Sequence, residues 1–421
     1  MKEELLILSP VDGRVYARLH YANGGEIAQA VSEAQSAFQE WRRTPLDERI
    51  ARVTAFVSEL QKDRTQLAEH VTWQMGRPLQ DADEAGYLLE AVDYYAALAR
   101  DVLVDQPTSA SPGIDRFTRR APLGVHLAIC AWNYPVAMVA AIVLPALIAG
   151  NTVLFKHAPQ TALVSEALNV AAERSGLGTG VFRAIHMTHR DTEQLIGSGD
   201  IQSLHFIGSE RGGRAVNAAS RGAFVDVALE LGGKDATYVR ADADIDFAAR
   251  EIATGCFDNS GQSCCSVERI YVHDDVYDRF VEALARAADG WTLGHPVDDT
   301  PSIGPVANIQ AAERIRLHLR DAEAKGARGI LPRSQAFPGE DKGCYISPQI
   351  VLEVSQDSLL MQEETFGPVA PVMRVSSDDE ALKLMDDTTF GLTAGVWTND
   401  TAVVERFGKH LDVGLFYQNR C

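Results

Sequence analysis

The sequence is poor in cysteine, and its few cysteines are not arranged as a framework. Only six of its 421 residues are cysteine, at positions 130, 256, 264, 265, 344 and 421, and no two of them have CxxC spacing. Such usage excludes a small disulfide-stabilised scaffold and favours a reducing compartment. No second Cys or His pair stands at a usual zinc spacing from the adjacent 264/265 pair, so we expect no metal site.

Positive charge and long apolar runs are scarce as well. The 58 acidic residues outnumber the 39 basic ones, which gives a formal net charge of −19 and argues against a nucleic-acid surface. The most apolar run, residues 136–150, is shorter than the ~20 residues of a membrane span and contains Pro145, so it predicts a buried helix. The N-terminus has no secretory or transit character. We therefore expect a cytoplasmic protein with no nucleic-acid and no membrane partner.

The spacing of apolar residues along the chain changes near residue 123. Before that point apolar residues recur at helical spacing, which predicts a helical first hundred residues; the two clearest sets are Ile27, Val31, Ala34, Phe38, Trp41 and Ile50, Val53, Val57, Leu60. After it, short apolar runs typical of strands stand at 124–130, 152–156, 180–186, 203–209 and 224–231, with helical stretches near 136–149, 161–175, 190–197 and 210–220. This alternation predicts a doubly wound parallel sheet, which binds ligands at the carboxyl ends of its strands.

A second alternating region follows. It contains strand-like runs at 268–273, 348–354, 370–375 and 391–398 and helical stretches at 275–288 and 306–325. We expect a second α/β domain that begins near residue 232, with Gly232 and Gly233 as a hinge.

The stretch FDNSGQSCCSVER (257–269) places Cys264 and Cys265 in a polar, glycine-containing turn. A cysteine becomes a nucleophile only where its surroundings favour the thiolate. Gly261 and its neighbours indicate an open turn whose amide hydrogens could face a sulfur atom. Two buried structural cysteines in a tight turn are the alternative.

Glu230 interrupts the apolar run VALELGGK (227–234). A buried carboxylate is costly unless it is paired or functional. Glu230 is therefore either a general base or a residue on the solvent face of an alternating strand.

Two polar residues follow predicted strands. Asn133, in CAWNYP (130–135), carries an amide that suits an oxyanion or a turn, and Lys156, in TVLFKHAPQT (152–161), carries a cation that suits a dinucleotide or solvent. Further along, Gly208 and Gly213 flank a strand-to-helix turn suited to a pyrophosphate, although the turn is not GxGxxG.

In sequence order, these motifs and the later EETFGP (363–368) resemble the aldehyde dehydrogenase superfamily, from near the N-terminus to the last residues. The stretch KHAP is also faintly similar to succinate-semialdehyde dehydrogenases. The resemblance implies an α/β fold: a Rossmann-type parallel-sheet domain, a second α/β catalytic domain and a small oligomerisation strand element.

The resemblance also implies roles for individual residues. Cys264 is the expected nucleophile in the pattern GQ-x-C, Cys265 its non-catalytic neighbour, Glu230 the general base and Asn133 the side-chain half of the oxyanion hole. The expected cofactor-binding residues are Trp132, Lys156, Gly208, Ser209, Gly213, Glu364 and Phe366.

Within the cofactor set, Lys156 would hold the adenosine ribose, Gly208 and Ser209 would lie against the pyrophosphate, and Glu364 would hold the nicotinamide ribose. Many NAD-preferring relatives carry a glutamate where this chain has Pro159. We expect NAD as the cofactor, with NADP possible.

By the same resemblance, the dinucleotide-binding domain comprises residues 1–112 and 123–231, the catalytic domain residues 232–412, and the oligomerisation element residues 113–122 and 413–421. We expect a homodimer or homotetramer. Relatives continue beyond this last segment with a loop, a helix and a strand, so we expect the C-terminal part of the element to be missing.

The resulting functional hypothesis is NAD(P)-dependent oxidation of a small-molecule aldehyde to its acid, with a thioester on Cys264 hydrolysed through Glu230. The hydrolytic outcome is favoured because relatives that transfer the acyl group to coenzyme A generally lack this glutamate. A non-catalytic family member that acts as a binding or structural protein is one alternative. A cofactor-free cysteine hydrolase is another, but it needs a histidine base near Cys264, and none is evident.

Overall fold

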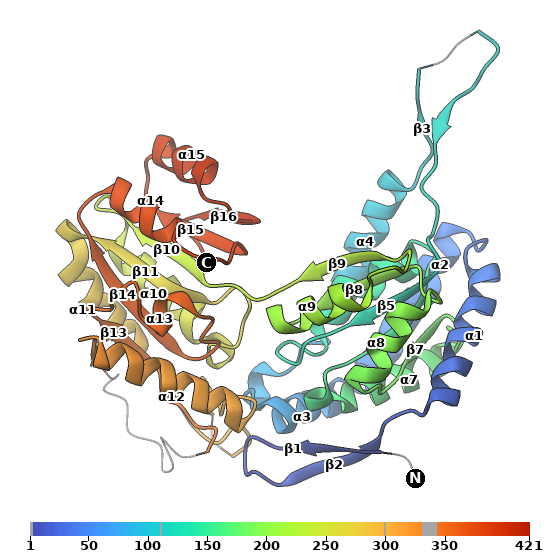
Figure 1. Cartoon of the computed structure of the whole chain (residues 1–421), viewed down its shortest axis with the longest axis horizontal. Coiled ribbons are helices and arrows are strands. Elements are labelled where there is room, and N and C mark those ends of the chain that lie inside the picture. The colour runs from blue at the N-terminus through green and yellow to red at the C-terminus, as the bar shows by residue number, and fades with distance from the viewer. Residues whose placement is uncertain (1–2, 110–111, 299, 331–342) are drawn as a thin grey trace. The chain divides into compact units, whose positions relative to one another are not determined.

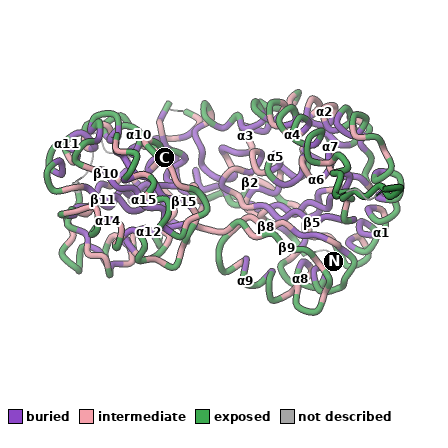
Figure 2. The backbone as a smooth tube through the Cα atoms, turned by 90° about the horizontal axis from the view of Figure 1, so that it is seen from above, coloured by how far each residue is buried: buried purple, intermediate pink, exposed green. Residues whose placement is uncertain are grey.

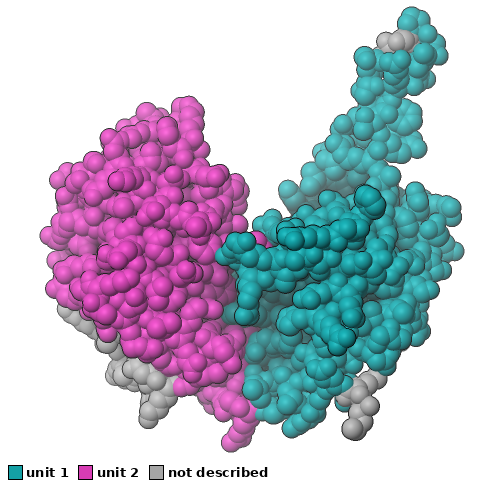
Figure 3. Space-filling model, in the orientation of Figure 1, with its two compact units in different colours: residues 1–8, 15–74, 81–230 teal, residues 9–14, 75–80, 231–421 magenta. Residues whose placement is uncertain are grey.

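The computed structural model describes residues 3–109, 112–298, 300–330 and 343–421. It divides the chain into two compact units, coloured separately in Figure 3. Unit 1 contains residues 1–8, 15–74 and 81–230, and unit 2 contains residues 9–14, 75–80 and 231–421. The boundary falls between Glu230 and Leu231. The assignment of a dinucleotide-binding domain, a catalytic domain and an oligomerisation element to parts of the chain stays a prediction.

Unit 1 is built on a five-stranded parallel sheet in the order β7-β6-β5-β8-β9 (Figure 1). The strands are β5 (Val125–Ile129), β6 (Thr152–Lys156), β7 (Phe182–Ala184), β8 (Ser203–Ile207) and β9 (Asp226–Glu230). All five fall within the apolar runs found in the sequence, so the doubly wound parallel sheet is confirmed. Figure 2 shows the buried backbone along β5, every residue of which is buried.

Helices cover both faces of this sheet. They are α1 (Gly24–Trp41), α2 (Leu46–Lys62), α3 (Arg64–Met75), α4 (Leu88–Val102), α5 (Ala137–Ile142), α6 (Leu144–Ile148), α7 (Leu163–Ser175), α8 (His189–Ser198) and α9 (Glu210–Ala219). Asn23 starts α1 through a capping box with Glu26. Helices α1, α8 and α9 pack on β5, β6 and β8 in one core. On the other face Phe56 of α2 lies 5.2 Å from Phe182, centroid to centroid.

The apolar run 136–150 differs from its prediction as one buried helix. It forms two short helices, α5 and α6, that meet at Val143. Pro145 lies in the first turn of α6, where its missing N–H and its ring are tolerated, whereas inside one continuous helix they would break the hydrogen-bond ladder.

The first hundred residues are not helical throughout, and that prediction was wrong at the N-terminus. Strands β1 (Glu4–Leu8) and β2 (Val15–His20) form an antiparallel pair. Alternate residues of β1 are buried, because Leu5 and Ile7 pack against Ala162 while their neighbours face solvent.

A second antiparallel pair extends from the body of unit 1 (Figure 1). It joins β3 (Gln106–Pro107) to β4 (Phe117–Thr118). Large apolar side chains are exposed along this segment, namely Val104, Ile114 and Phe117. Residues 113–122, expected to form a strand of an oligomerisation element, thus contribute the two residues of β4.

Unit 2 contains a seven-stranded sheet in the order β12-β13-β14-β11-β10-β15-β16. All neighbours are parallel except β12 and β13. The strands are β10 (Asp235–Val239), β11 (Val267–His273), β12 (Arg328–Ile330), β13 (Gln349–Leu352), β14 (Val369–Val375), β15 (Thr393–Trp397) and β16 (Leu415–Gln418). The predicted second α/β region is confirmed, although β10 and β12 were not among the strands expected from the sequence.

Two layers of helices complete unit 2. One core joins the sheet to α10 (Ile245–Phe257) and α11 (Tyr277–Ala288). The other joins it to α12 (Ile309–Ala324), α13 (Leu359–Gln362), α14 (Asp378–Asp386) and α15 (Thr401–His410). Among the described residues, no helix is both long and apolar enough to cross a membrane.

The last segment of the chain belongs to this sheet. Residues of β16 pair in parallel with β15, from Leu415 opposite Thr393 to Gln418 opposite Val396. The role expected for residues 413–421 in contacts between copies of the chain stays a prediction.

The packing of unit 2 predicts a strong dependence on Phe280. This side chain of α11 is fully buried in the core beside α10, so Phe280→Ala leaves a cavity and should lower the free energy of unfolding by about 3–5 kcal/mol. The matched control is Phe224→Ala, at a fully exposed site, which should leave stability unchanged. Urea denaturation of both variants measures the difference, and equal midpoints would contradict this account of the core.

Candidate active site

The predicted residues of unit 1 gather at the carboxyl ends of its parallel strands. Lys156 is the last residue of β6 and Glu230 the last of β9, while Gly208 follows β8 directly and Asn133 lies in the turn after β5. Trp132 and Ser209 lie in the same two turns, and Gly213 lies in α9. This is the edge at which an open α/β sheet binds its ligands.

The turn that carries Asn133 is held from both sides. The Glu84 carboxylate accepts hydrogen bonds from the backbone N–H groups of Val136 (2.9 Å) and Ala137 (2.7 Å). Nε2 of His157 donates to the Pro135 carbonyl (2.9 Å). Burial lowers the pKa of His157 to about 4, which keeps the ring neutral. Asn133 itself is buried, so its amide is fixed in place.

Sequence reasoning missed both of these supports. His157 could have been found, because it follows Lys156 in KHAP, and its Nδ1 also accepts from the Thr161 hydroxyl (2.8 Å). Glu84 carries no local signal, since it lies 49 positions before Asn133 in the printed sequence.

Lys156 is a cation in a mostly buried position. Its exposed fraction is only 4%, and burial lowers the pKa of its ammonium group to about 8. A mostly buried lysine at a strand end is suited to donate hydrogen bonds to a polar group of a ligand. This fits the expected contact with a ribose.

The turn after β8 fits a pyrophosphate. The hydroxyl of Ser209 caps α9 by accepting from the Gly212 N–H (3.3 Å), so a helix N-terminus with its partial positive charge begins here. A Cβ atom at Gly208 would lie 2.7 Å from the Phe206 ring. The Gly208 N–H donates to the carbonyl of Glu230 (3.0 Å), which ties this turn to the end of β9.

Glu230 is exposed at the end of a strand whose residues alternate between exposed and partly buried. Glu230 is therefore not buried as the apolar run suggested, and its assignment as the general base stays a prediction. In β9, the edge strand of the sheet, the alternate residues Asp226, Ala228 and Glu230 are exposed. An exposed carboxylate can contact water directly.

The predicted residues of unit 2 lie at the amino ends of its strands. Cys264 lies just before β11, and Glu364 and Phe366 lie just before β14. The carboxyl-end rule deduced from the sequence therefore does not extend to this sheet.

The turn before Cys264 is strained. Asn259 (φ 52°), Ser260 (φ 58°) and Gly261 (φ 68°) are all left-handed, a conformation that costs a non-glycine residue roughly 1–3 kcal/mol. Buried hydrogen bonds hold it: the Ser260 hydroxyl donates to the Gly304 carbonyl (2.9 Å), and the Gln262 side chain accepts from the Ala307 N–H (2.8 Å).

The two adjacent cysteines are accessible. Cys264 is partly exposed and Cys265 is exposed, with their Sγ atoms 3.7 Å apart. The alternative of two buried structural cysteines was therefore wrong for this pair, although it describes Cys130 and Cys256.

Two glycines let the predicted elements of unit 2 meet. A Cβ atom at Gly232 would lie 2.2 Å from Oε1 of Glu364, and one at Gly233 would lie 2.7 Å from the carbonyl oxygen of Cys264. The Gly233 N–H donates to Oε1 of Glu364 (3.1 Å). The glycines of LGGK therefore bring the backbone against both the cysteine turn and Glu364.

Glu364 is set for ligand binding near neutral pH. Burial and, to a lesser extent, the charge of Glu268 together raise the pKa of its carboxyl group to about 7, against the lowering effect of the Gly233 hydrogen bond. Its ionisation is therefore sensitive to a ligand that supplies hydrogen-bond donors. The sequence missed Glu268 itself, although a carboxylate within the apolar run SVERIYVH was a signal.

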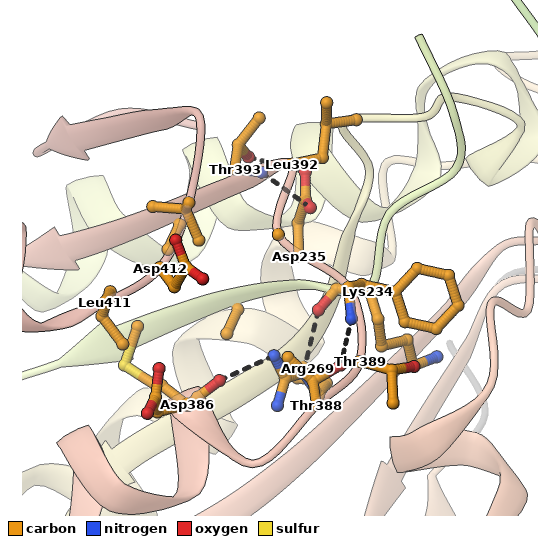
Figure 4. A pocket seen from close by; sticks show the side chains of 16 residues that line it. Lys234, Asp235, Arg269, Asp386, Thr388, Thr389, Leu392, Thr393, Leu411 and Asp412 are labelled. Carbon is orange, nitrogen blue, oxygen red and sulfur yellow. Dashed lines mark hydrogen bonds between the residues drawn. The ribbon is translucent and has the colours of Figure 1, made fainter. Parts of the chain in front are cut away.

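Unit 2 also contains a partly open cavity of about 410 Å³ at the amino ends of β10 and β15 (Figure 4). On its wall, the Asp235 carboxylate accepts from the N–H (3.0 Å) and hydroxyl (2.6 Å) of Thr393. Arg269 donates to the carbonyls of Lys234 (2.9 Å) and Met385 (2.9 Å). No residue predicted as functional from the sequence lines this cavity. Within the described part of the chain, no group of three or more potential metal ligands comes together.

Comparison with known proteins identifies the relatives of this chain. The model of the aldehyde dehydrogenase family matches residues 1–421. The NADP(+)-named succinate-semialdehyde dehydrogenase of Deinococcus radiodurans is 33% identical over 417 residues, which cover 98% of this chain and 86% of that protein. The 3-sulfolactaldehyde dehydrogenase of Pseudomonas putida is also 33% identical, over 98% of this chain and 85% of that protein.

A solved structure gives the same result for the fold. The crystal structure of an indole-3-acetaldehyde dehydrogenase complexed with NAD+ superposes with a TM-score of 0.93 at 28% identity, over 99% of this chain and 86% of that one. The expected α/β fold of the aldehyde dehydrogenase type is thereby confirmed.

The exposure of the cysteines predicts their reactivity. An alkylating reagent at neutral pH should modify Cys264 and Cys265 in the folded protein. It should spare Cys130 and Cys256 until denaturant is added, because burial raises the pKa of both thiols and blocks access. Peptide mass spectrometry before and after denaturation measures this. Modification of Cys256 as fast as Cys265 would contradict the packing of α10.

Proposed function

Because the chain belongs to the aldehyde dehydrogenase family, we propose that Cys264 is its nucleophile in the NAD(P)-dependent oxidation of an aldehyde to a carboxylic acid. The observation that carries this proposal is the accessible Cys264 beside a strained turn, with its carbonyl packed on LGGK and that motif hydrogen-bonded to Glu364. The exposure of Cys264 also favours a catalytic protein over a purely structural one.

The first step belongs to Cys264 and Asn133. The thiolate forms a bond to the carbonyl carbon of the aldehyde, and the π electrons move to the oxygen. The Asn133 amide and the backbone N–H of Cys264 then donate hydrogen bonds to this oxyanion. Each such donor is worth about 2.7–4 kcal/mol in related chemistry. The burial of Asn133 and the hydrogen bond that holds its turn support this role.

Each unit, taken by itself, carries residues suited to one part of a nicotinamide dinucleotide. Lys156 would bind the adenosine ribose, the N-terminus of α9 with Gly208 and Ser209 the pyrophosphate, and Glu364 the nicotinamide ribose. Trp132, Gly213 and Phe366 would complete the binding surface. When bound, the nicotinamide would accept a hydride. The acyl group would then remain on Cys264 as a thioester.

Glu230 completes the reaction. Its carboxylate takes a proton from a water molecule, whose oxygen attacks the thioester carbon. The carbon–sulfur bond breaks, the acid leaves, and the Cys264 thiolate is restored. The exposure of Glu230, and so its access to water, supports this assignment.

We expect both NAD and NADP to act as the hydride-accepting cofactor. Pro159 puts no carboxylate where one would repel a 2′-phosphate, and Deinococcus radiodurans provides a relative named for NADP(+). Succinate semialdehyde and 3-sulfolactaldehyde, the substrates in the names of two relatives, are the first aldehydes to assay.

We also propose that the protein is cytoplasmic and forms a homodimer or homotetramer. The scarcity of cysteine, with six in 421 residues, and the net charge of −19 support a reducing, aqueous compartment. The exposed apolar side chains beside β3 and β4 support an interface between copies of the chain.

Removal of the nucleophile tests the proposal. Cys264→Ala should abolish NAD(P)H formation from aldehydes, because the proposed acyl intermediate forms on its sulfur atom. Cys265→Ala, its exposed neighbour, is the matched control and should retain at least about half of the wild-type rate, since surface substitutions cost little. Absorbance at the reduced nicotinamide band measures both. Substantial turnover by the first variant would refute the assignment.

The general base makes a separate prediction. Glu230→Gln should slow thioester breakdown by about a hundredfold or more while the first burst of reduced cofactor persists, because only hydrolysis needs the carboxylate. Rapid mixing and steady-state assays separate the two phases. An unchanged steady-state rate would mean that another group activates the water.

A further inference from the structure

The carboxylate of Glu268 is buried where a single charge would be costly. Glu268 is the second residue of β11 and is 3% exposed. Its Oε2 lies 2.5 Å from Nζ of Lys234, whose side chain is fully buried. Pairing with Lys234 thus accounts for the position of Oε2 but not for that of Oε1.

The same carboxylate also binds the backbone of the EETFGP segment. Oε2 accepts from the Thr365 N–H (2.7 Å), and Oε1 accepts from the Phe366 N–H (2.7 Å). Compensation of Lys234 requires neither bond. A carboxylate that accepts from two consecutive amides fixes the orientation of that peptide segment.

Lys234 and α12 support the segment from other sides. Nζ of Lys234 also donates to the Thr365 hydroxyl (3.1 Å), and Nδ1 of His318 lies 3.1 Å from the same oxygen. The Arg314 side chain donates to the Thr365 carbonyl (3.3 Å). The Thr365 peptide is therefore held at its N–H, its carbonyl and its side chain.

The segment needs this support because its backbone is strained. Phe366 has φ = 53°, a left-handed conformation that is unfavourable for a bulky residue. Glu364 directly precedes Thr365 and receives the Gly233 N–H. If the Thr365–Phe366 turn relaxed to an ordinary conformation, the direction of the Glu364 side chain would change with it.

We infer that Glu268 is a positioning residue for cofactor binding: it holds the Thr365–Phe366 turn in the conformation that presents Glu364 to the nicotinamide ribose. The inference rests on the proposed function of Glu364. It assigns Glu268 no contact with the cofactor or with the reacting atoms.

The test is Glu268→Gln in the full chain, with dissociation constants for NAD+ and NADP+ from isothermal titration calorimetry. The amide nitrogen of glutamine cannot accept, so one backbone N–H loses its partner. The dissociation constants and the cofactor KM should rise about tenfold to hundredfold. The aldehyde KM and the alkylation rate of Cys264 without cofactor should stay at wild-type values.

Asp378→Asn is the matched control within unit 2. The Asp378 carboxylate likewise accepts from Tyr238 (2.9 Å) and Arg240 (3.1 Å), but it lies at the start of α14 and contacts none of the proposed cofactor residues. This variant should lower the thermal midpoint and leave cofactor affinity unchanged. If Glu268→Gln behaves in the same way, Glu268 is only structural and the inference is overturned.

A second variant decides the matter if Glu268→Gln does not fold. Glu268→Asp keeps the charge beside Lys234 but is too short to reach both amides, so the dissociation constants should rise at least about threefold. Unchanged affinity would overturn the inference. Wild-type protein that binds neither dinucleotide would instead refute the proposed function, and this inference with it.

Discussion

The ion pair between Lys234 and Glu268 connects three parts of unit 2 that are far apart in the sequence. Lys234 precedes β10, Glu268 lies in β11, and the amides that share its carboxylate precede β14. Removing either partner would leave an uncompensated buried charge at a cost of several kcal/mol. The cysteine turn depends on the same arrangement, because Gly233 packs against the carbonyl of Cys264 and donates to Glu364.

The two sheets present their functional residues in opposite senses. In unit 1 these residues end or follow strands, where helix N-termini and exposed amides suit anionic ligands. In unit 2 they precede strands, and the short segment 231–234 leads from the carboxyl end of β9 to the amino end of β10. This difference follows from the direction of the chain, which leaves the first sheet at the carboxyl end of a strand, Glu230, and enters the second at the amino end of a strand, Asp235.

Much of this organisation could be predicted from the sequence. The strands of unit 1 lie in short, mostly apolar runs, and Cys264, Glu230, Asn133 and Lys156 stand in motifs of recognisable order. Contacts between distant residues could not be predicted. Glu84, for example, supports the Asn133 turn through a fold that no local pattern encodes. The hairpin of β1 and β2 was missed because its alternation is short.

The close contacts around Gly232, Gly233 and Gly261 have a consequence for a saturation-mutagenesis survey of this chain. A methyl group at Gly261 would lie 2.2 Å from the carbonyl oxygen of Gly367, which is as restrictive as the contacts of the other two glycines. None of the three carries a functional group. Substitutions at these glycines would nevertheless reduce function as strongly as substitutions at the nucleophile. Such a survey would therefore report tightly packed positions together with catalytic ones.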